Sequence, residues 1–156
     1  MIEGARPASS DDLARLAELA RAAIAELRAT KGGGVWARRE ARVEPIEDSL
    51  AADLANGDTL VLAGVIDDAM IGYAVVTTEA LSDGGAIARL TDVYVEPEAR
   101  GVGVGEALLD AVVEWATERK CVGIDSLALP GNRETKNFFE TFGFTARLLV
   151  VHRSLR

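Results

Sequence analysis

Residues 91–109 constrain this chain most, because they join a strand pattern to a helix pattern through a loop of alternate glycines. The glycines are Gly101, Gly103 and Gly105. A loop in this position directs free backbone N–H groups and the positive end of the helix at one point. Glycine also lets the backbone approach phosphate oxygens closely. We therefore predict an anion site suited to a pyrophosphate, to which Arg100 adds a charge-assisted hydrogen bond.

Three phosphate-binding motifs compete for this loop. A Walker A loop requires a Lys after its last glycine, and none follows here. The dinucleotide fingerprint G-x-G-x-x-G/A, started at Gly101, needs Gly or Ala where Glu106 stands. The pattern Q/R-x-x-G-x-G/A is matched by Arg100, Gly103 and Gly105. A glycine turn without a ligand is the alternative, but glycines that open a helix lower its stability, so their presence requires a reason.

Periodicity and turn signals divide the chain into alternating strands and helices. Ser9 and Asp12 form a capping-box pattern at the start of the first helix. Three β-like runs are joined by short turn-rich connections, which favours a meander of antiparallel hairpins. The predicted strands are 2–6, 59–66, 70–78, 86–95, 122–129 and 144–152, and the predicted helices are 9–29, 46–56, 104–119 and 133–141. We expect residues 32–42 to be a flexible connection.

The order β-α-α-β-β-β-α-β-α-β predicts an α/β (α+β) fold in a single domain over residues 1–156. The hydrophobic content of 49% suffices for a core without disulfides or metals. The formal net charge of −8, with no block of Lys or Arg, argues against nucleic acid and anionic membrane surfaces as partners.

The cysteine and histidine content and the length of the apolar runs limit where the protein can be located and which metal or disulfide chemistry it can carry. Cys121 is the only cysteine and His152 the only histidine, so we expect neither an intramolecular disulfide nor a metal site. The N-terminus lacks an apolar signal core, and the longest apolar run, 60–66, is too short for a membrane span. We expect a protein of the reducing cytoplasm. Cys121 is expected to be a buried spectator thiol, and His152 a solvated or packing residue.

A second motif lies near the C-terminus, where Asn132 leads a helix that ends in Gly143-Phe144. Together with the glycine loop, and in the right order, it resembles the signatures of the GCN5-related N-acetyltransferases. The resemblance spans most of the chain. It implies a mixed, mostly antiparallel, splayed central sheet flanked by helices. It also implies acetyl-CoA as co-substrate, an amine as acceptor, and direct attack in a ternary complex.

The resemblance also assigns roles to individual residues. The main chain of Val93 and Val95 would pair with the pantetheine arm, and the N–H of Val93 would polarise the thioester carbonyl. The loop from Arg100 to Gly105 would hold the pyrophosphate, with Asn132 beside the arm. The full implied cofactor set is Val93, Val95, Arg100, Gly101, Val102, Gly103, Val104, Gly105, Asn132, Thr135 and Phe139.

The catalytic acid departs from the family pattern. Phe139 stands where relatives commonly carry a Tyr that protonates the departing sulfur, and Phe has no proton to donate. A thiol leaves tolerably as thiolate, so loss of the acid slows transfer without forbidding it. Tyr94, Thr135 or a water molecule are the candidate substitutes, with a core role as the alternative for Tyr94. The rival hypothesis is a catalytically weak acyl-CoA-binding module.

Asp92 is the best carboxylate for orienting the amine or a water chain, and a structural Asp bonded to nearby main chain is its alternative. In the family that the chain resembles, the loop between the first two helices covers the acceptor. Trp36 in this loop is therefore a candidate for stacking on a ligand, and Arg38 or Arg39 for binding a carboxylate or phosphate. A mobile loop solvated by its charges is the alternative there.

Because the chain ends soon after Phe144, we expect a second subunit to complete the sheet edge, and hence a homodimer.

Overall fold

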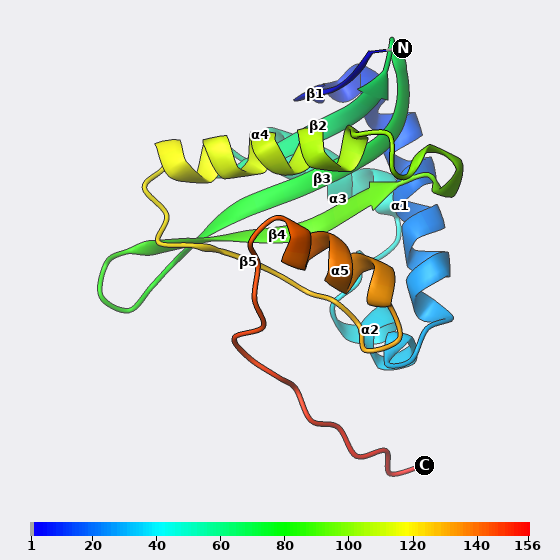
Figure 1. Cartoon of the computed structure of the whole chain (residues 1–156), viewed down its shortest axis with the longest axis vertical. Helices are drawn as coiled ribbons and strands as arrows, with labels where there is room; N and C mark the ends of the chain where they lie inside the picture. The colour runs from blue at the N-terminus through cyan, green and yellow to red at the C-terminus, as the bar shows by residue number, and fades with distance from the viewer. Residues whose placement is uncertain (1) are drawn as a thin grey trace.

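A five-stranded sheet in the order β1-β2-β3-β4-β5 forms the middle layer of the computed structural model, which describes residues 2–156 (Figure 1). The first four strands pair antiparallel, and β5 pairs parallel to β4. The strands are β1 (Glu3–Pro7), β2 (Thr59–Ile66), β3 (Ala69–Ala80), β4 (Ala86–Val95) and β5 (Ile124–Ser126). The helices are α1 (Leu13–Arg28), α2 (Gly33–Arg39), α3 (Ile46–Ala55), α4 (Val104–Glu118) and α5 (Arg133–Thr141).

Helices cover both faces of the sheet, and each face has its own core. Leu16 of α1 and Leu50 of α3 pack with Val75 on one face. Leu108 of α4 packs with Val76 on the other, where α5 also contributes. Neighbouring residues of one strand serve opposite cores because successive side chains of a strand alternate. The predicted α/β class and the mixed, mostly antiparallel sheet are confirmed.

A β-bulge at Thr91 controls which way the end of β4 faces. Val75 is paired with Asp92, but the next residue of β3 is paired with Leu90, so Thr91 is the extra residue. Leu90 belongs to the core under α4. After the bulge, Tyr94 belongs to the core under α1 and α3. The extra residue therefore turns Asp92 and Tyr94 to the α1 face, which strict alternation from Leu90 would not do.

The sheet opens between β4 and β5. The two strands are paired only where Ala88, Leu90 and the residue between them face Ile124–Ser126. At the last pair the Ser126 hydroxyl donates to the Leu90 carbonyl oxygen at 2.9 Å. Beyond it β4 continues to Val95, whereas the chain after β5 runs to α5. This is the splay implied by the family resemblance.

Three segments differ from the sequence expectation, the first being the predicted strand 122–129, of which only Ile124–Ser126 forms a strand, β5. Residues 33–39, expected to be part of a flexible connection, form α2. Gly33 makes this compact turn feasible, because a Cβ there would lie 2.0 Å from the Leu27 carbonyl oxygen at the end of α1. The predicted strand 144–152 is wrong for the isolated chain, since these residues form no strand and leave the domain as an extended tail (Figure 1). Four successive apolar residues, Leu148 to Val151, give it no alternating face to bury within its own chain.

Candidate functional site

One cavity of about 700 Å³ follows the splay of the sheet and reaches the α1 face. We call its two ends the cofactor end and the acceptor end. The cofactor end is lined by Gly101, Gly103, Gly105, Asn132 and Thr135. The acceptor end is lined by Trp36, Glu40, Arg42, Asp53, Thr91 and Asp92. The predicted anion loop and the predicted acceptor side thus border one continuous space.

The glycine loop has the backbone conformation that an anion site needs. Gly101 and Gly103 have φ angles of +86° and +97°, in the left-handed region that favours glycine. Gly103 is the N-cap of α4 and has no side chain with which to cap it, so the first N–H groups of the helix are left for an external acceptor. This loop fits a pyrophosphate. The Val104 side chain is fully buried in the core, so only its main chain is available to a ligand.

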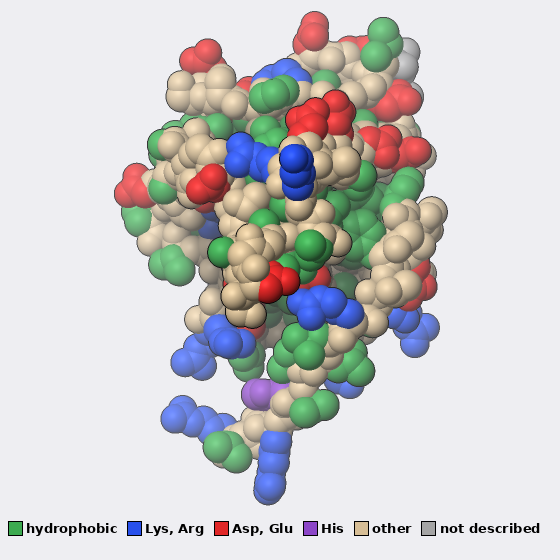
Figure 2. Space-filling model, turned by 90° about the vertical axis from the view of Figure 1, so that its left-hand side faces the viewer, with side chains coloured by type: hydrophobic (Ala, Val, Ile, Leu, Met, Phe, Trp, Pro, Cys, Tyr) green, Lys and Arg blue, Asp and Glu red, His purple; other side chains and the backbone are tan. Residues whose placement is uncertain are grey.

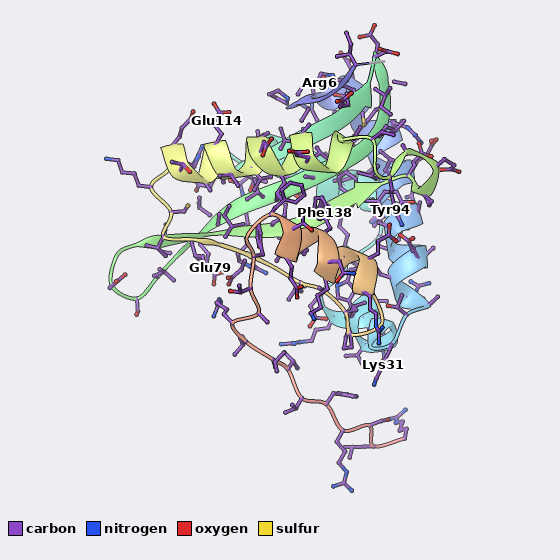
Figure 3. The ribbon with its side chains drawn as sticks, in the orientation of Figure 1. Arg6, Lys31, Glu79, Tyr94, Glu114 and Phe138 are labelled. Carbon is purple, nitrogen blue, oxygen red and sulfur yellow. The ribbon has the colours of Figure 1, made fainter. Side chains whose placement is uncertain are left out.

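Phe138 of α5 closes the wall beside this loop. It lines the cavity, and a Cβ on Gly105 would lie 3.0 Å from its ring, so glycine there permits the close approach of α5 to α4. Figure 3 shows Phe138 between these helices. Phe139, the ring expected in the cofactor wall, is only 6% exposed and packs on Phe144 with ring centroids 5.0 Å apart. Phe138 and Phe142 both line the cavity and are four residues apart, so they lie on one face of α5. This spacing is the sequence signal that could have identified the cavity-facing side of the helix.

Arg100 is held at the cofactor end by two carboxylates. Its Nη1 and Nη2 donate to Glu26 of α1 at 3.0 and 2.8 Å, and Nη1 also donates to Glu134 of α5 at 3.3 Å. Its Nε donates to the Val95 carbonyl oxygen at 2.8 Å, and the guanidinium lies 5.5 Å from the centre of the Tyr94 ring. The hydrogen bonds that Arg100 donates to Glu26 raise the pKa of Arg100. These bonds leave one of the five N–H groups, on Nη2, without a partner among the described residues, so a phosphate that takes two hydrogen bonds from this guanidinium must displace a carboxylate.

Asn132 fixes the start of α5, because its side-chain oxygen accepts from the Thr135 N–H at 3.1 Å. Both residues line the cavity opposite β4. On β4, the Ala88 N–H donates toward the β5 side, to Gly123, and the Leu90 carbonyl faces the same way. The bulge at Thr91 shifts this alternation by one residue. The main-chain groups of Val93 and Val95, rather than those of Asp92 and Tyr94, consequently face the opening.

At the acceptor end, Asp92 is the centre of a hydrogen-bond network. Arg42 donates to its two oxygens through Nε at 3.0 Å and Nη2 at 2.8 Å. The Tyr73 hydroxyl donates to Asp92 at 2.7 Å, and the Thr91 hydroxyl at 2.8 Å. The carboxylate therefore accepts four hydrogen bonds from neighbouring side chains. Such an arrangement favours a positioning role for Asp92 over a freely exchanging base.

Arg42 links Asp92 to α3. Its Nη1 donates to Asp53 at 2.5 Å and to the Ser49 hydroxyl at 2.9 Å, and its side chain is only 8% exposed. Burial lowers the pKa of Arg42, but the hydrogen bonds and charges of Asp92 and Asp53 outweigh burial and raise it overall. Burial raises the pKa of Tyr73 well above its ordinary value. One cation facing two carboxylates leaves this group with a net charge of about −1.

The remaining candidates are spread over the molecule. Trp36 lines the acceptor end, whereas Arg38 is exposed and Arg39 pairs with Glu40 at 3.0 Å. Cys121 packs beside the core under α4. His152 lies on the exposed tail. Within residues 2–156 there is no group of three His, Cys, Asp or Glu side chains suited to a metal ion. Nor does any helix in that range have the length and apolar character to cross a membrane.

With this geometry in place, comparison with known proteins decides the family. The model of the acetyltransferase (GNAT) family matches residues 18–144. The chain belongs to this GNAT family. The matched range contains the glycine loop, the strand with the bulge and the whole of α5. Transfer of an acetyl group from acetyl-CoA is the chemistry of the family, and the cofactor end described above has the donors for it.

Individual relatives agree with the family assignment. A thialysine N-epsilon-acetyltransferase of Sus scrofa is 30% identical over 74 residues, which are 47% of this chain and 44% of that protein. The chain therefore matches less than half of that relative. AAC(6')-Iy, solved with the bisubstrate analogue CoA-S-monomethyl-acetylneamine, has a TM-score of 0.76 at 18% identity and covers 100% of this chain and 99% of its own. An aminoglycoside acetyltransferase from an uncultured soil metagenomic sample, solved with sisomicin, has a TM-score of 0.73 at 17% identity and covers 99% and 95%. At these identities the two structures share the fold.

Proposed function

We propose that this GNAT protein is an acetyl-CoA-dependent N-acetyltransferase whose acceptor is a small, positively charged amine. The observation that carries the proposal is the single cavity that joins a pyrophosphate-type loop to an acidic acceptor end. In the reaction, the amine nitrogen forms a C–N bond with the acetyl carbon while the C–S bond of the thioester breaks. The cationic nitrogen first releases one proton to water and so becomes a neutral nucleophile. On transfer it loses a second proton, and CoA leaves as a thiolate and takes up one.

The cofactor end supplies binding and carbonyl polarisation. The N–H groups of the loop and of the start of α4, together with Arg100, hold the pyrophosphate. The main chain of Val93 and Val95 pairs with the pantetheine arm, and Asn132 and Thr135 border its other side. The N–H of Val93 stabilises the negative charge that develops on the thioester oxygen. Because these donors belong to the main chain, the role does not depend on the side chain at position 93.

The acceptor end supplies attraction and orientation. The net negative Arg42 group gives it charge that a cationic amine complements. Glu40 adds a carboxylate whose partner, Arg39, is exposed and can be exchanged for the amine. Trp36 offers an aromatic face at the same end. Asp92, fixed by its four hydrogen bonds, orients the amine directly or through a water molecule. The thialysine and aminoglycoside enzymes named above have amine acceptors, which supports the same class here.

Tyr94 is the side chain proposed to return the proton to the departing sulfur, with Thr135 and water as its competitors. Burial raises the pKa of Tyr94, so its hydroxyl stays protonated at neutral pH. Its ring lies at the end of β4 near α1 (Figure 3) and lines the cavity. Removal of a general acid typically costs roughly 10²–10⁴-fold in rate. Tyr94→Phe should therefore lower kcat by at least about tenfold, with little change in acetyl-CoA affinity.

The test is CoA release over a panel of amines. We expect diamines and aminosugars to be acetylated with higher kcat/KM than neutral or acidic amines of the same size. Glu40→Gln should lower kcat/KM for the cationic acceptors, and Glu18→Gln, on an exposed part of α1 outside the cavity, should not. Binding of acetyl-CoA by calorimetry without turnover of any amine would instead support the rival, an acyl-CoA-binding module. Absence of binding at millimolar acetyl-CoA would refute both.

The half-buried Cys121 suits a reducing compartment, and we propose the cytoplasm as the location. Fractionation of cells that produce the protein, with a cytoplasmic marker as reference, tests this. Enrichment in the membrane or secreted fraction would contradict it.

A further inference from the structure

Negative charge at the acceptor end is concentrated in the group around Arg42. On the face of the molecule that Figure 2 shows, acidic and basic side chains of residues 2–156 are interspersed. Inside the cavity, by contrast, one cation, Arg42, faces two carboxylates, Asp53 and Asp92. The contact through which this negative charge reaches the amine nitrogen consequently decides how the acceptor is oriented.

The hydrogen-bond capacity of Asp92 is already filled by the protein. A carboxylate has about four lone-pair sites for hydrogen bonds. Arg42 occupies one site on each oxygen, Tyr73 adds a second bond to Oδ2, and Thr91 adds a second bond to Oδ1. An amine that approaches this carboxylate therefore has to displace one of these donors or bind to one of them.

The three donors differ in how well the amine can reach them. The Arg42 side chain is 8% exposed and Tyr73 is 2% exposed. Displacing Arg42 would also break a buried ion pair, which is costly. Thr91 is exposed and lines the cavity. Among residues 2–156, it is therefore the donor to Asp92 that an amine in the cavity can contact.

The β-bulge is the feature that joins Thr91 to Asp92. Neighbouring side chains in a regular strand point to opposite faces of the sheet, so they do not hydrogen bond to each other. Here the Thr91 hydroxyl lies 2.8 Å from Asp92 Oδ1, and the Val75 carbonyl oxygen, at 3.3 Å, is the more distant acceptor. Bulges commonly re-aim a side chain beside a functional site. The extra residue of β4 thus holds an exposed hydroxyl against the carboxylate.

The Thr91 hydroxyl keeps acceptor capacity for a ligand. A hydroxyl donates one hydrogen bond and has two lone pairs that accept. Its proton is committed to Asp92, and no donor within residues 2–156 is bonded to its lone pairs. Hydrogen bonds in a chain polarise one another, so a hydroxyl that donates to a carboxylate is a stronger acceptor. The charge of Asp92 can therefore act on an amine through Thr91 without any bond of the network being broken.

We propose that the Thr91 hydroxyl binds the reacting nitrogen, accepting a hydrogen bond from one of its N–H groups while donating its own proton to Asp92. The inference rests on the proposed acetyl transfer and specifies where the acceptor end contacts the acceptor. As the nitrogen attacks the acetyl carbon it gains positive charge, so its bond to the Thr91–Asp92 pair is stronger in the transition state. Thr91 keeps its own proton throughout, because it orients the nitrogen and is not the base.

Steady-state kinetics of Thr91→Val and Thr91→Ser test the contact, with ethylenediamine, putrescine, lysine and glucosamine as acceptors. Valine has nearly the shape of threonine without the hydroxyl, whereas serine keeps the hydroxyl. For the best of these acceptors, Thr91→Val should lower kcat/KM about 10- to 100-fold, mostly through kcat, and Thr91→Ser should stay within about threefold of the wild type. The Kd for acetyl-CoA should be unchanged in both variants.

Thr78→Val is the matched control, because it makes the same exchange on β3 at a residue outside the cavity, and it should leave kcat/KM unchanged. A double-mutant cycle separates the contact from a loss of packing. In an Asp92→Asn background, Thr91→Val should lower kcat/KM by less than about threefold, since the hydroxyl then has no charge to transmit. Unchanged circular dichroism of each variant shows that the domain remains folded.

Three outcomes would overturn the inference alone. They are a Thr91→Val protein as active as the wild type, a Thr91→Ser protein impaired as strongly as Thr91→Val, and additive losses for Thr91→Val and Asp92→Asn. A wild-type protein that releases CoA with none of these amines would instead contradict the proposed function, on which the inference rests.

Discussion

The cofactor end and the acceptor end of the cavity are built in opposite ways. The cofactor end relies on main-chain groups of a short continuous loop, whose conformation is set by Gly101 and Gly103. The acceptor end relies on side chains from distant elements, with Arg42 joining Asp53 of α3 to Asp92 of β4. Substitutions should therefore act on the first mainly through backbone conformation and on the second mainly through charge pairing and burial.

The ends differ in charge balance as well. At the cofactor end one arginine, Arg100, is shared by Glu26 and Glu134, which are partly exposed and can move aside. At the acceptor end Arg42 is buried between two aspartates. An exposed ion pair contributes little to stability, whereas breaking a buried one is costly. We expect the cofactor end to exchange its carboxylates for phosphate and the acceptor end to stay rigid.

The largest effect expected is on stability at the acceptor end. Arg42→Ala leaves Asp53 and Asp92 facing each other without their counter-ion, and should lower the free energy of unfolding by about 3–5 kcal/mol. Urea unfolding measures the change. Arg6→Ala removes an exposed pair with Asp12 and should cost at most about 1 kcal/mol. Equal losses in the two variants would contradict the distinction between a buried and an exposed ion pair, on which the contrast of Arg42 with Arg100 rests.

At the cofactor end, Gly103→Ala should impair binding beyond its cost in stability. Its positive φ angle alone costs about 1–2 kcal/mol for a residue with a side chain. A Cβ would also lie 3.1 Å from the Glu3 side chain. We expect acetyl-CoA affinity in calorimetry to fall by roughly tenfold or more, equivalent to at least 1.4 kcal/mol.

Gly84→Ala is the control for this variant. Gly84 has a φ angle of +91° and open space around it, and it lies in the turn between β3 and β4. It should show the stability loss without the loss of affinity. A loss of affinity in both variants would mean that backbone strain, and not the anion loop, is responsible.

Tyr73→Phe gives a smaller and pH-dependent effect. The lost hydrogen bond to Asp92 should cost about 1.5 kcal/mol near neutral pH. The pKa of Tyr73 is raised in the folded protein, so its contribution to stability is complete below pH 10. That contribution is lost as the pH rises above the pKa that the tyrosine has in the unfolded chain. Wild-type stability should then fall relative to the variant by about 1.4 kcal/mol per pH unit. Urea unfolding from pH 8 to pH 11 tests this, and a constant difference would refute it.

The smallest effect concerns the carboxylate that holds Arg100. Glu26→Gln should raise acetyl-CoA affinity by up to about fivefold, because an exposed ion pair contributes at most about 1 kcal/mol. Glu134→Gln, with its single longer contact, should have less effect. Calorimetry at low and high salt measures both. Weaker binding in Glu26→Gln would mean that Glu26 positions Arg100 for the phosphate and does not compete with it.

The contrast between a continuous loop and side chains from distant elements also explains which parts of the fold and site could be predicted from the sequence. The loop, the helix that follows it and α5 were predictable because their residues are contiguous and carry local turn and helix signals. Arg42 was missed because it lies 50 residues from Asp92 and in a segment without periodicity. Tyr73 was missed because its hydroxyl gains a partner only when two strands pair. The family pattern assigned Phe139 to the cofactor wall. In the structure the face of α5 that carries Phe138 lines the cavity, and Phe139 packs into the core.

The bulge at Thr91 makes the length of β4 matter more than its composition. Replacing Val93 or Val95 by another strand-forming residue leaves the peptide groups in place. Deleting a residue beyond the bulge, such as Val93, would instead exchange the two faces of everything that follows: Tyr94 would turn toward α4, and the main-chain groups of Val95 would turn toward β3. Single-residue insertions and deletions in this strand beyond the bulge should therefore be excluded in proteins that share this site, even where side chains vary freely.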